Sequence, residues 1–168
     1  MDLDADIVAG RSIAGIGLGE VALETIEALQ RRHRVAQYPA LNPDYTCYRV
    51  DDALLLIVDN RDFVLVNLAA LSGYRGRLFG YIRPGMSVRE LIAGAPSALL
   101  KDLRPHNQFL YLDRAQSTGF MLPPQYDDAV DRVDDLPPEL VLDALYLMPA
   151  QMRQVPGRDG KPVWRPVD

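Results

Sequence analysis

The sequence predicts an α+β protein built around antiparallel sheet, and three observations carry that prediction. Runs of apolar residues separated by short polar breaks predict strands joined as hairpins. Two segments show the 3.6-residue apolar spacing of a surface helix. A pattern of strand, glycine corner and helix occurs twice along the chain. Successive strands with one main helix in each half are typical of α+β folds and not of alternating α/β folds.

The repeated pattern starts at Ile16-Gly17-Leu18-Gly19 and again at Ile82-Arg83-Pro84-Gly85. An apolar-periodic run follows each copy, and Glu24 of the first copy then corresponds to Glu90 of the second. Strand-like segments come after both runs, so the order of elements is close to βαβββ in each half. One interpretation is a tandem βαβββ pseudo-repeat. The other is a chance similarity between two strand–turn–helix units.

The length and composition are those of one globular domain. A compact chain of 168 residues hides about 70% of its unfolded surface, and 48% hydrophobic with 24% charged residues is ordinary for such a fold. We predict a single domain over residues 1–150, made of two similar halves at about 11–71 and 74–150. Residues 151–168 are rich in proline and glycine and lack periodicity, so we expect an extended C-terminal tail.

The first half is predicted to open with a strand and its most regular helix. Residues 1–11 read as a loose acidic lead-in, and Ser12 to Ile16 as a short strand that ends at glycines. A helix is predicted from Leu18 to His33, with acidic residues early and arginines late to complement the helix dipole. Its apolar stripe consists of Leu18, Ala22, Ile26, Leu29 and His33.

Three strands are predicted to follow this helix, at Tyr45–Val50, Ala53–Val58 and Phe63–Ala69. Aspartate-rich breaks between them, such as Asp51-Asp52, are typical of hairpin turns. The run from Leu54 to Val58 is apolar at every position, which predicts a central strand covered on both faces.

The second half is predicted to contain a strand from Arg77 to Ile82 and a corner at Pro84-Gly85. Ser87 and Glu90 have the S-x-x-E spacing of a capping box, which predicts a helix start at this point. Pro96 soon ends that helix. The remaining strand candidates are Asn107–Asp113, Gly119–Leu122 and Leu140–Met148.

Several functional classes are disfavoured by composition. The net charge of −5 argues against nucleic-acid binding, which usually requires a basic face. No apolar run approaches the roughly 20 residues of a membrane span. The start of the chain is acidic and lacks the basic and apolar regions of a secretory signal, so we expect a cytoplasmic protein. Cys47 is the single cysteine, which excludes a disulfide within the chain.

Catalytic motifs are missing from the sequence, so we predict no catalytic residue, no cofactor and no metal site. The glycines of Gly15–Gly19 do not complete a dinucleotide fingerprint, because Glu20 would place a carboxylate near the pyrophosphate. His33 continues a helix stripe, where packing at the helix end is the simpler explanation. His106 lies in a predicted loop without an evident partner, and neither histidine has zinc-ligand spacing.

Charge is unevenly distributed along the chain. Residues 63–89 hold four arginines and no acid, whereas residues 126–143 hold seven acids and one arginine. Such an acidic segment is suited to a basic protein surface, and an aromatic residue within it would add desolvated contact. The alternatives are a solvated loop and a segment that docks on the chain's own arginines. The predicted partner-binding residues are Tyr126, Asp127, Asp128, Asp131, Asp134, Asp135 and Glu139.

The stretch from Tyr74 to Ile92 fits the pattern Y-x-G-x-L-x-G-x-I-x-x-G-M-[ST] leading into a helix. Gly119-Phe120-Met121-Leu122-Pro123 and a final strand from Asp143 to Met148 follow it. Over residues 74–148 the chain therefore resembles small bacterial immunity-type proteins of toxin/immunity systems. The resemblance implies a protein that neutralises a cognate toxin by binding it. It assigns no functional residue, because the similar positions belong to the scaffold.

We therefore expect a non-catalytic binding protein whose acidic segment covers a basic cleft of a cognate toxin. Three alternatives remain open. The first is a small enzyme that uses carboxylates or His106 in a cleft between the halves. The second is a sensor that binds a small ligand between the halves, and the third is a subunit of a larger assembly.

Overall fold

The computed structural model describes residues 2–100, 103–106, 108–126, 130–149, 152–156 and 162–166. Eight of the described strands form one antiparallel sheet in the order β3-β4-β5-β6-β12-β10-β9-β8. The α+β class is thereby confirmed. The strands are β3 (Val35–Pro39), β4 (Tyr45–Val50), β5 (Leu54–Asp59), β6 (Leu65–Ala70), β8 (Arg104–His106), β9 (Phe109–Tyr111), β10 (Thr118–Met121) and β12 (Leu145–Leu147).

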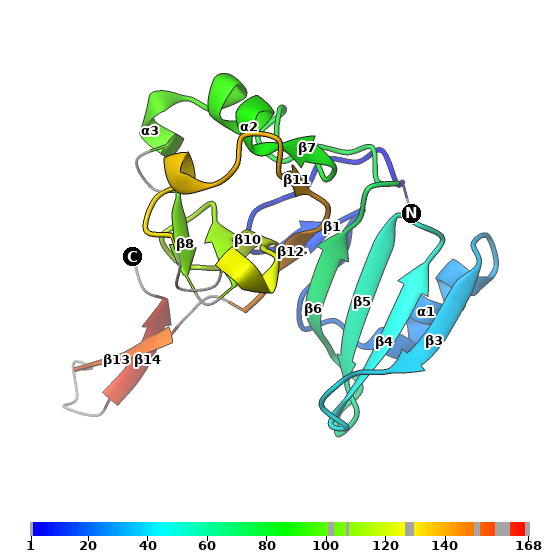
Figure 1. Cartoon of the computed structure of the whole chain (residues 1–168). Helices are drawn as coiled ribbons and strands as arrows, with labels where there is room; N and C mark the ends of the chain where they lie inside the picture. The colour runs from blue at the N-terminus through cyan, green and yellow to red at the C-terminus, as the bar shows by residue number, and fades with distance from the viewer. Residues whose placement is uncertain are drawn as a thin grey trace.

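The two halves of the chain share this sheet and meet at its centre. β6 closes the first half and β12 closes the second, and they pair antiparallel with Leu68 opposite Leu147 and Ala70 opposite Leu145. Figure 1 shows β3–β6 on one side of this junction and β8–β12 on the other. The hydrophobic core is likewise one cluster of buried residues drawn from both halves.

Three α-helices are described, α1 (Ala22–Gln30), α2 (Val88–Gly94) and α3 (Ser97–Leu100). The predicted capping box starts α2: the Ser87 hydroxyl accepts from the Glu90 N–H at 3.2 Å, and the Ser87 N–H donates to Glu90 Oε2 at 2.7 Å. α1 begins after Val21, later than the sequence predicted, because the glycine corner extends to Gly19 (φ +81°).

The segment Arg77–Ile82 is not the strand that the sequence predicted. Phe79 (φ +54°) and Gly80 (φ +78°) both adopt left-handed conformations, and the chain reverses so that Leu78 N–H donates to Ile82 O at 2.8 Å. The predicted strand Ser12–Ile16 is interrupted in the same way at Ala14 and Gly15, giving the hairpin β1 (Ser12–Ile13) and β2 (Ile16–Gly17). Two successive positive φ values are typical of tight hairpin turns.

The residue before each main helix pairs with a residue that shortly precedes one of the two central strands, β6 or β12. Val21, before α1, bridges Val64 next to β6. Ser87, in β7 (Met86–Ser87), pairs with Val141 in β11 (Val141–Leu142), a short strand ahead of β12. This likeness is limited to the helix starts, because the first half runs β1-β2-α1-β3-β4-β5-β6 and the second β7-α2-α3-β8-β9-β10-β11-β12, and neither has the predicted βαβββ order. Tandem duplication remains a hypothesis.

The N-terminal lead-in packs against the body instead of lying loose. Ile7 is 3% exposed, and its N–H donates to the Arg77 carbonyl at 2.9 Å. The Tyr74 hydroxyl donates to the Ala5 carbonyl at 2.6 Å and accepts from the Ala14 N–H at 3.0 Å. Burial raises the pKa of Tyr74 to about 12, so this hydroxyl keeps its proton as a structural tie.

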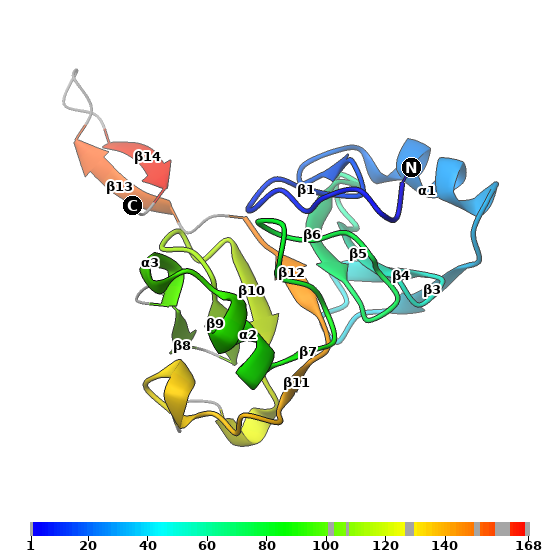
Figure 2. The same cartoon turned by 90° about the horizontal axis from the view of Figure 1, so that it is seen from above.

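The C-terminal segment contains the hairpin of β13 (Met152–Pro156) and β14 (Pro162–Pro166), which forms a two-stranded sheet of its own. The sequence predicted an extended tail here and did not predict that β13 and β14 pair as a hairpin. Figures 1 and 2 show the hairpin projecting from the body. Among the residues with described structure, none of the helices combines the length and the apolar character needed to cross a bilayer.

Candidate binding surfaces

The acidic segment is held in place by its apolar residues and presents its carboxylates to solvent. Val133 and Leu136 are buried; Val133 begins a 3-10 turn, η2 (Val133–Asp135), and Leu136 follows it. The exposed carboxylates in the described part of the segment include Asp131, Asp134, Asp135 and Glu139. Asp127 and Asp128, which the sequence also assigned to the partner-binding set, lie outside the described residues.

Tyr126 ends a second 3-10 turn, η1 (Pro124–Tyr126). Its side chain is half-buried and packs against the hydrophobic core. Part of the ring is therefore already used in folding, so Tyr126 offers less free surface than an exposed aromatic anchor would.

The chain's own arginines neutralise only part of the acidic segment. Arg89 makes an ion pair with Glu139, and its N–H donates to the Pro138 carbonyl at 2.9 Å. The alternative in which the arginine run docks on the acidic segment is therefore confirmed for this pair. Arg132 lies 3.5 Å from Asp134, a distance at which an exposed pair is weak. Within the described residues, Asp131 and Asp135 have no ion-pair partner.

A second candidate surface is the face of the sheet that lies away from α1, here called the open face. Residues that are directly opposite in an antiparallel sheet share a face. The registers place Ala36, Arg49, Leu55, Ala69, Tyr146 and Tyr111 along one line across this face. In Figure 1, the open face of β3–β6 points toward the viewer, and no described helix lies in front of it.

Apolar side chains occupy much of the open face, contrary to the prediction that β5 is covered on both sides. Leu54, Leu56 and Val58 are buried on the core side, whereas Leu55 and Ile57 are only half-buried on the open face. A solvated sheet face usually carries polar residues at these positions. The apolar run from Leu54 to Val58 indicated that both faces of β5 carry apolar side chains. It did not indicate whether anything covers the open face.

An aromatic cluster lies at the centre and far end of the open face. The Phe109 ring stacks on Tyr111 at a centroid distance of 5.8 Å and meets the Tyr146 ring edge-on at 5.6 Å. Tyr111 lies against Gly119, where an added Cβ would come within 3.3 Å of the Tyr111 ring. Burial raises the pKa of both tyrosines, so their hydroxyls stay protonated at neutral pH.

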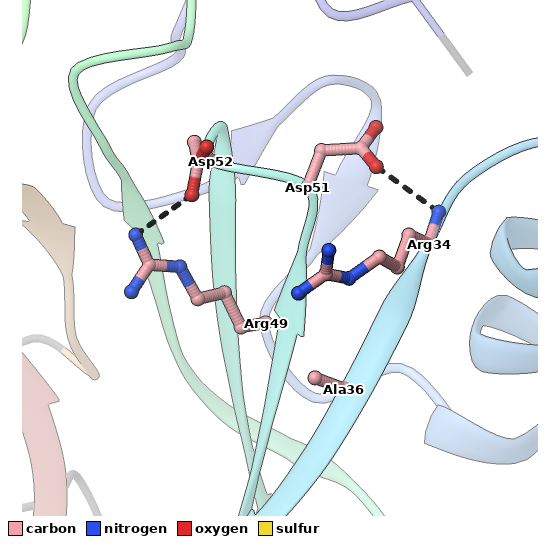
Figure 3. A pocket seen from close by; sticks show the side chains of 5 residues that line it. All are labelled: Arg34, Ala36, Arg49, Asp51 and Asp52. Atoms are coloured by element: carbon pink, nitrogen blue, oxygen red, sulfur yellow. Dashed lines mark hydrogen bonds and ion pairs between the residues drawn. The ribbon is translucent and has the colours of Figure 1, made fainter.

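A surface pocket of about 330 Å³ lies at the β3–β4 end of the open face. It is lined by Arg34, Ala36, Arg49, Asp51 and Asp52. Figure 3 shows the two arginine side chains reaching into it, Arg34 from just before β3 and Arg49 from β4, with Ala36 below them. Asp51 accepts from the Arg34 N–H at 3.0 Å, and Arg49 makes a 3.0 Å ion pair with Asp52.

The carboxylates of this pocket have structural roles. Asp51 Oδ2 lies 2.9 Å from His33 Nδ1, and the hydrogen bonds from His33 and from the Arg34 N–H hold the pKa of Asp51 below its usual value. Asp51 and Asp52 also occupy the turn between β4 and β5, as the sequence predicted. The structure therefore uses His33 to fasten the end of α1 to this turn.

Outside this pocket, His, Cys, Asp and Glu side chains do not cluster as metal ligands in the described part of the chain. No set of three or more His, Cys, Asp or Glu side chains there is placed to hold a metal ion. His106 is exposed and has an interaction partner.

A second surface pocket, of about 440 Å³, is apolar and is lined by Phe79, Tyr81, Pro96, Ala98 and Leu99.

Comparison with models of known protein families, with curated proteins and with solved structures finds no match to this chain.

Proposed function

We propose that this protein is a non-catalytic binding protein of the cytoplasm, an immunity protein that neutralises a cognate bacterial toxin by covering its active site. The observation that carries the proposal is the acidic segment, whose exposed carboxylates are presented by a backbone that Val133 and Leu136 anchor in the core. A basic toxin cleft is the partner that such a surface fits best.

The exposed carboxylates of the acidic segment are expected to speed association with a basic partner. Asp131 and Asp135 are not neutralised by any described arginine, so their field extends toward an approaching partner. Complementary fields raise association rates and disfavour partners of the wrong charge. An immunity protein gains from both effects, since it must reach one toxin quickly.

The proposal is tested by purifying the protein from its native host together with the product of the adjacent reading frame. We expect a stoichiometric complex and loss of the neighbour's toxicity when both are expressed. A ligand-dependent rise in melting temperature without any protein partner would instead favour the small-ligand sensor. Turnover abolished by one substitution in a folded protein would favour the enzyme.

The contribution of the acidic segment is tested by changing Asp131, Asp134 and Asp135 together to Asn. We expect slower association with the toxin at low salt and a smaller dependence of the association rate on salt. A matched control changes Glu24, Glu27 and Asp62, three exposed acids elsewhere, to Gln, Gln and Asn. An equal effect of both triple variants would show that net charge, and not this segment, governs association.

A further inference from the structure

The outer edge of β3 is an unpaired strand edge. Among the described residues, β3 (Val35–Pro39) pairs with β4 on one side and with no strand on the other. The side chains from Ala36 to Pro39 are exposed. Figures 1 and 2 both place β3 at the outer limit of the first half, with α1 on the core side of the sheet.

Hydrogen bonds at both ends of β3 show which backbone groups point outward. Asp51 N–H donates to the Arg34 carbonyl at 2.9 Å, and Ala40 N–H donates to the Tyr45 carbonyl at 3.4 Å. Because such bonds alternate along an antiparallel strand, Ala36 and Tyr38 also bond toward β4. The N–H and C=O groups of Val35 and Gln37 therefore point away from the sheet, as does the C=O of Pro39.

The strand at the other edge of the sheet, β8, has more of the features that prevent further pairing than β3 has. β8 is three residues long and has Pro105 at its centre. Short edges, proline, lysine and bulges are the usual protections of an edge strand. β3 has five residues in a continuous register, and Val35–Tyr38 carries no charge. Pro39 at its end is the one protective residue.

We propose that β3 pairs antiparallel with β3 of a second copy of this chain, so that two sheets join across a two-fold axis. The strand is self-complementary in two registers. In the register centred on Gln37, the backbone N–H and C=O of Gln37 bond to those of Gln37 in the second copy, and Val35 N–H bonds to the second copy's Pro39 carbonyl. In the register centred on Ala36, the backbone groups of Val35 in each copy bond to those of Gln37 in the other copy. Either register forms about four backbone hydrogen bonds.

The pocket of Figure 3 favours a second copy as the occupant of this edge. Tyr38 is 41% exposed. It lies two residues from Ala36 in β3 and therefore projects from the same face of the sheet. In the two registers, the second copy's Tyr38 lies directly opposite Ala36 or Arg34, with Cβ atoms about 5 Å apart. Both residues line the pocket of about 330 Å³. The tyrosine ring would fill that space and stack on the arginine side chains.

The test is the mass of the full-length protein in solution, measured by sedimentation equilibrium from about 10 μM to about 1 mM. We expect a dimer. Ala36→Lys places a charge at the centre of the pairing and should weaken dimerisation at least ~10-fold. The matched control, Ala93→Lys, makes the same change at an exposed position of α2 and should leave the dimer intact.

Cross-linking gives a second measurement that also separates the registers. Ala36→Cys should form a disulfide-linked dimer in the register centred on Ala36, and Gln37→Cys in the register centred on Gln37. The wild type is the control, because its Cys47 is buried. A monomer throughout the concentration range overturns the proposal. So does a dimer that Ala36→Lys leaves unchanged and that neither cysteine links.

A monomer that gains a strand from another protein at β3 would show a different occupant and would also overturn the pairing between copies. None of these experiments includes a toxin. The outcome is therefore independent of the proposed immunity function.

Discussion

Two exposed phenylalanines hold a backbone conformation that glycine or asparagine adopts more easily. Phe63 (φ +55°) and Phe79 (φ +54°) lie at turns, and their side chains are 54% and 52% exposed. A left-handed conformation costs a non-glycine residue on the order of 1 kcal/mol. Neither side chain recovers this cost by full burial, so both positions carry strain.

We therefore expect Phe79→Asn to raise the free energy of unfolding by about 1 kcal/mol, because Asn-Gly is a preferred pair for two successive positive φ values. Urea unfolding followed by circular dichroism measures the change. Phe63→Asn is the parallel test at the other turn. A loss of stability in both variants would show that the rings contribute more through packing than the turns lose through strain.

The contact of Asp51 with His33 and Arg34 predicts a pH dependence. Its pKa is lowered from 3.8, first by the side-chain hydrogen bond with His33 and then by the Arg34 N–H. A carboxyl group whose pKa is lower in the folded state stabilises the fold above its unfolded pKa. That contribution is lost as the pH falls through the folded value.

Asp51→Asn should therefore flatten the decrease in the urea midpoint below pH 3.8 relative to the wild type. The series runs from neutral pH into this acidic range. Asp62→Asn, at an exposed position, serves as the control. Parallel curves for Asp51→Asn and the wild type would contradict the assigned role of the Asp51 contact.

At the scale of elements, the two main helices differ in how they begin. Ser87 caps α2, whereas Val21, 58% exposed, provides no side-chain cap for α1 in the described structure. Ser87→Ala should lower the free energy of unfolding by about 1 kcal/mol, and Val21→Ser should raise it by a few tenths to about 1 kcal/mol. Chemical denaturation tests both. Changes of the same sign would contradict this difference.

The sequence predicted those elements whose signals are local. The S-x-x-E spacing of Ser87 and Glu90 identifies the start of α2, and the aspartate turn at 51–52 separates β4 from β5. The tight turns at Ala14 and Phe79 were missed. Alanine and phenylalanine give no propensity signal for a left-handed conformation, and the tertiary structure imposes it on them.

At the scale of the whole molecule, pairing between distant segments is what the sequence left open. The β6–β12 pair joins residues near 70 to residues near 145, and local periodicity contains no information about such partners. For the same reason, the acidic segment could be found by its composition. The aromatic cluster of Phe109, Tyr111 and Tyr146 could not, since it joins rings of β9 to a ring of β12, two strands that are distant in the sequence.

Because one core crosses the β6–β12 junction, we expect the two halves to unfold together. Circular dichroism and hydrogen exchange should give coincident urea transitions. Leu145→Asp, at a fully buried position in β12, should lower the protection of amides in β4 and β5 as well as in β10. Two separate transitions, one for each half, would contradict a shared cooperative unit.

The hairpin of β13 and β14 offers a practical attachment point. Its strands hydrogen-bond to each other and add none to the eight-stranded sheet. A fluorophore or a surface anchor fixed there would leave both the carboxylates of the acidic segment and the backbone of β3 uncovered. The same molecule could then be used, in separate experiments, to test the toxin binding and the pairing between copies proposed above.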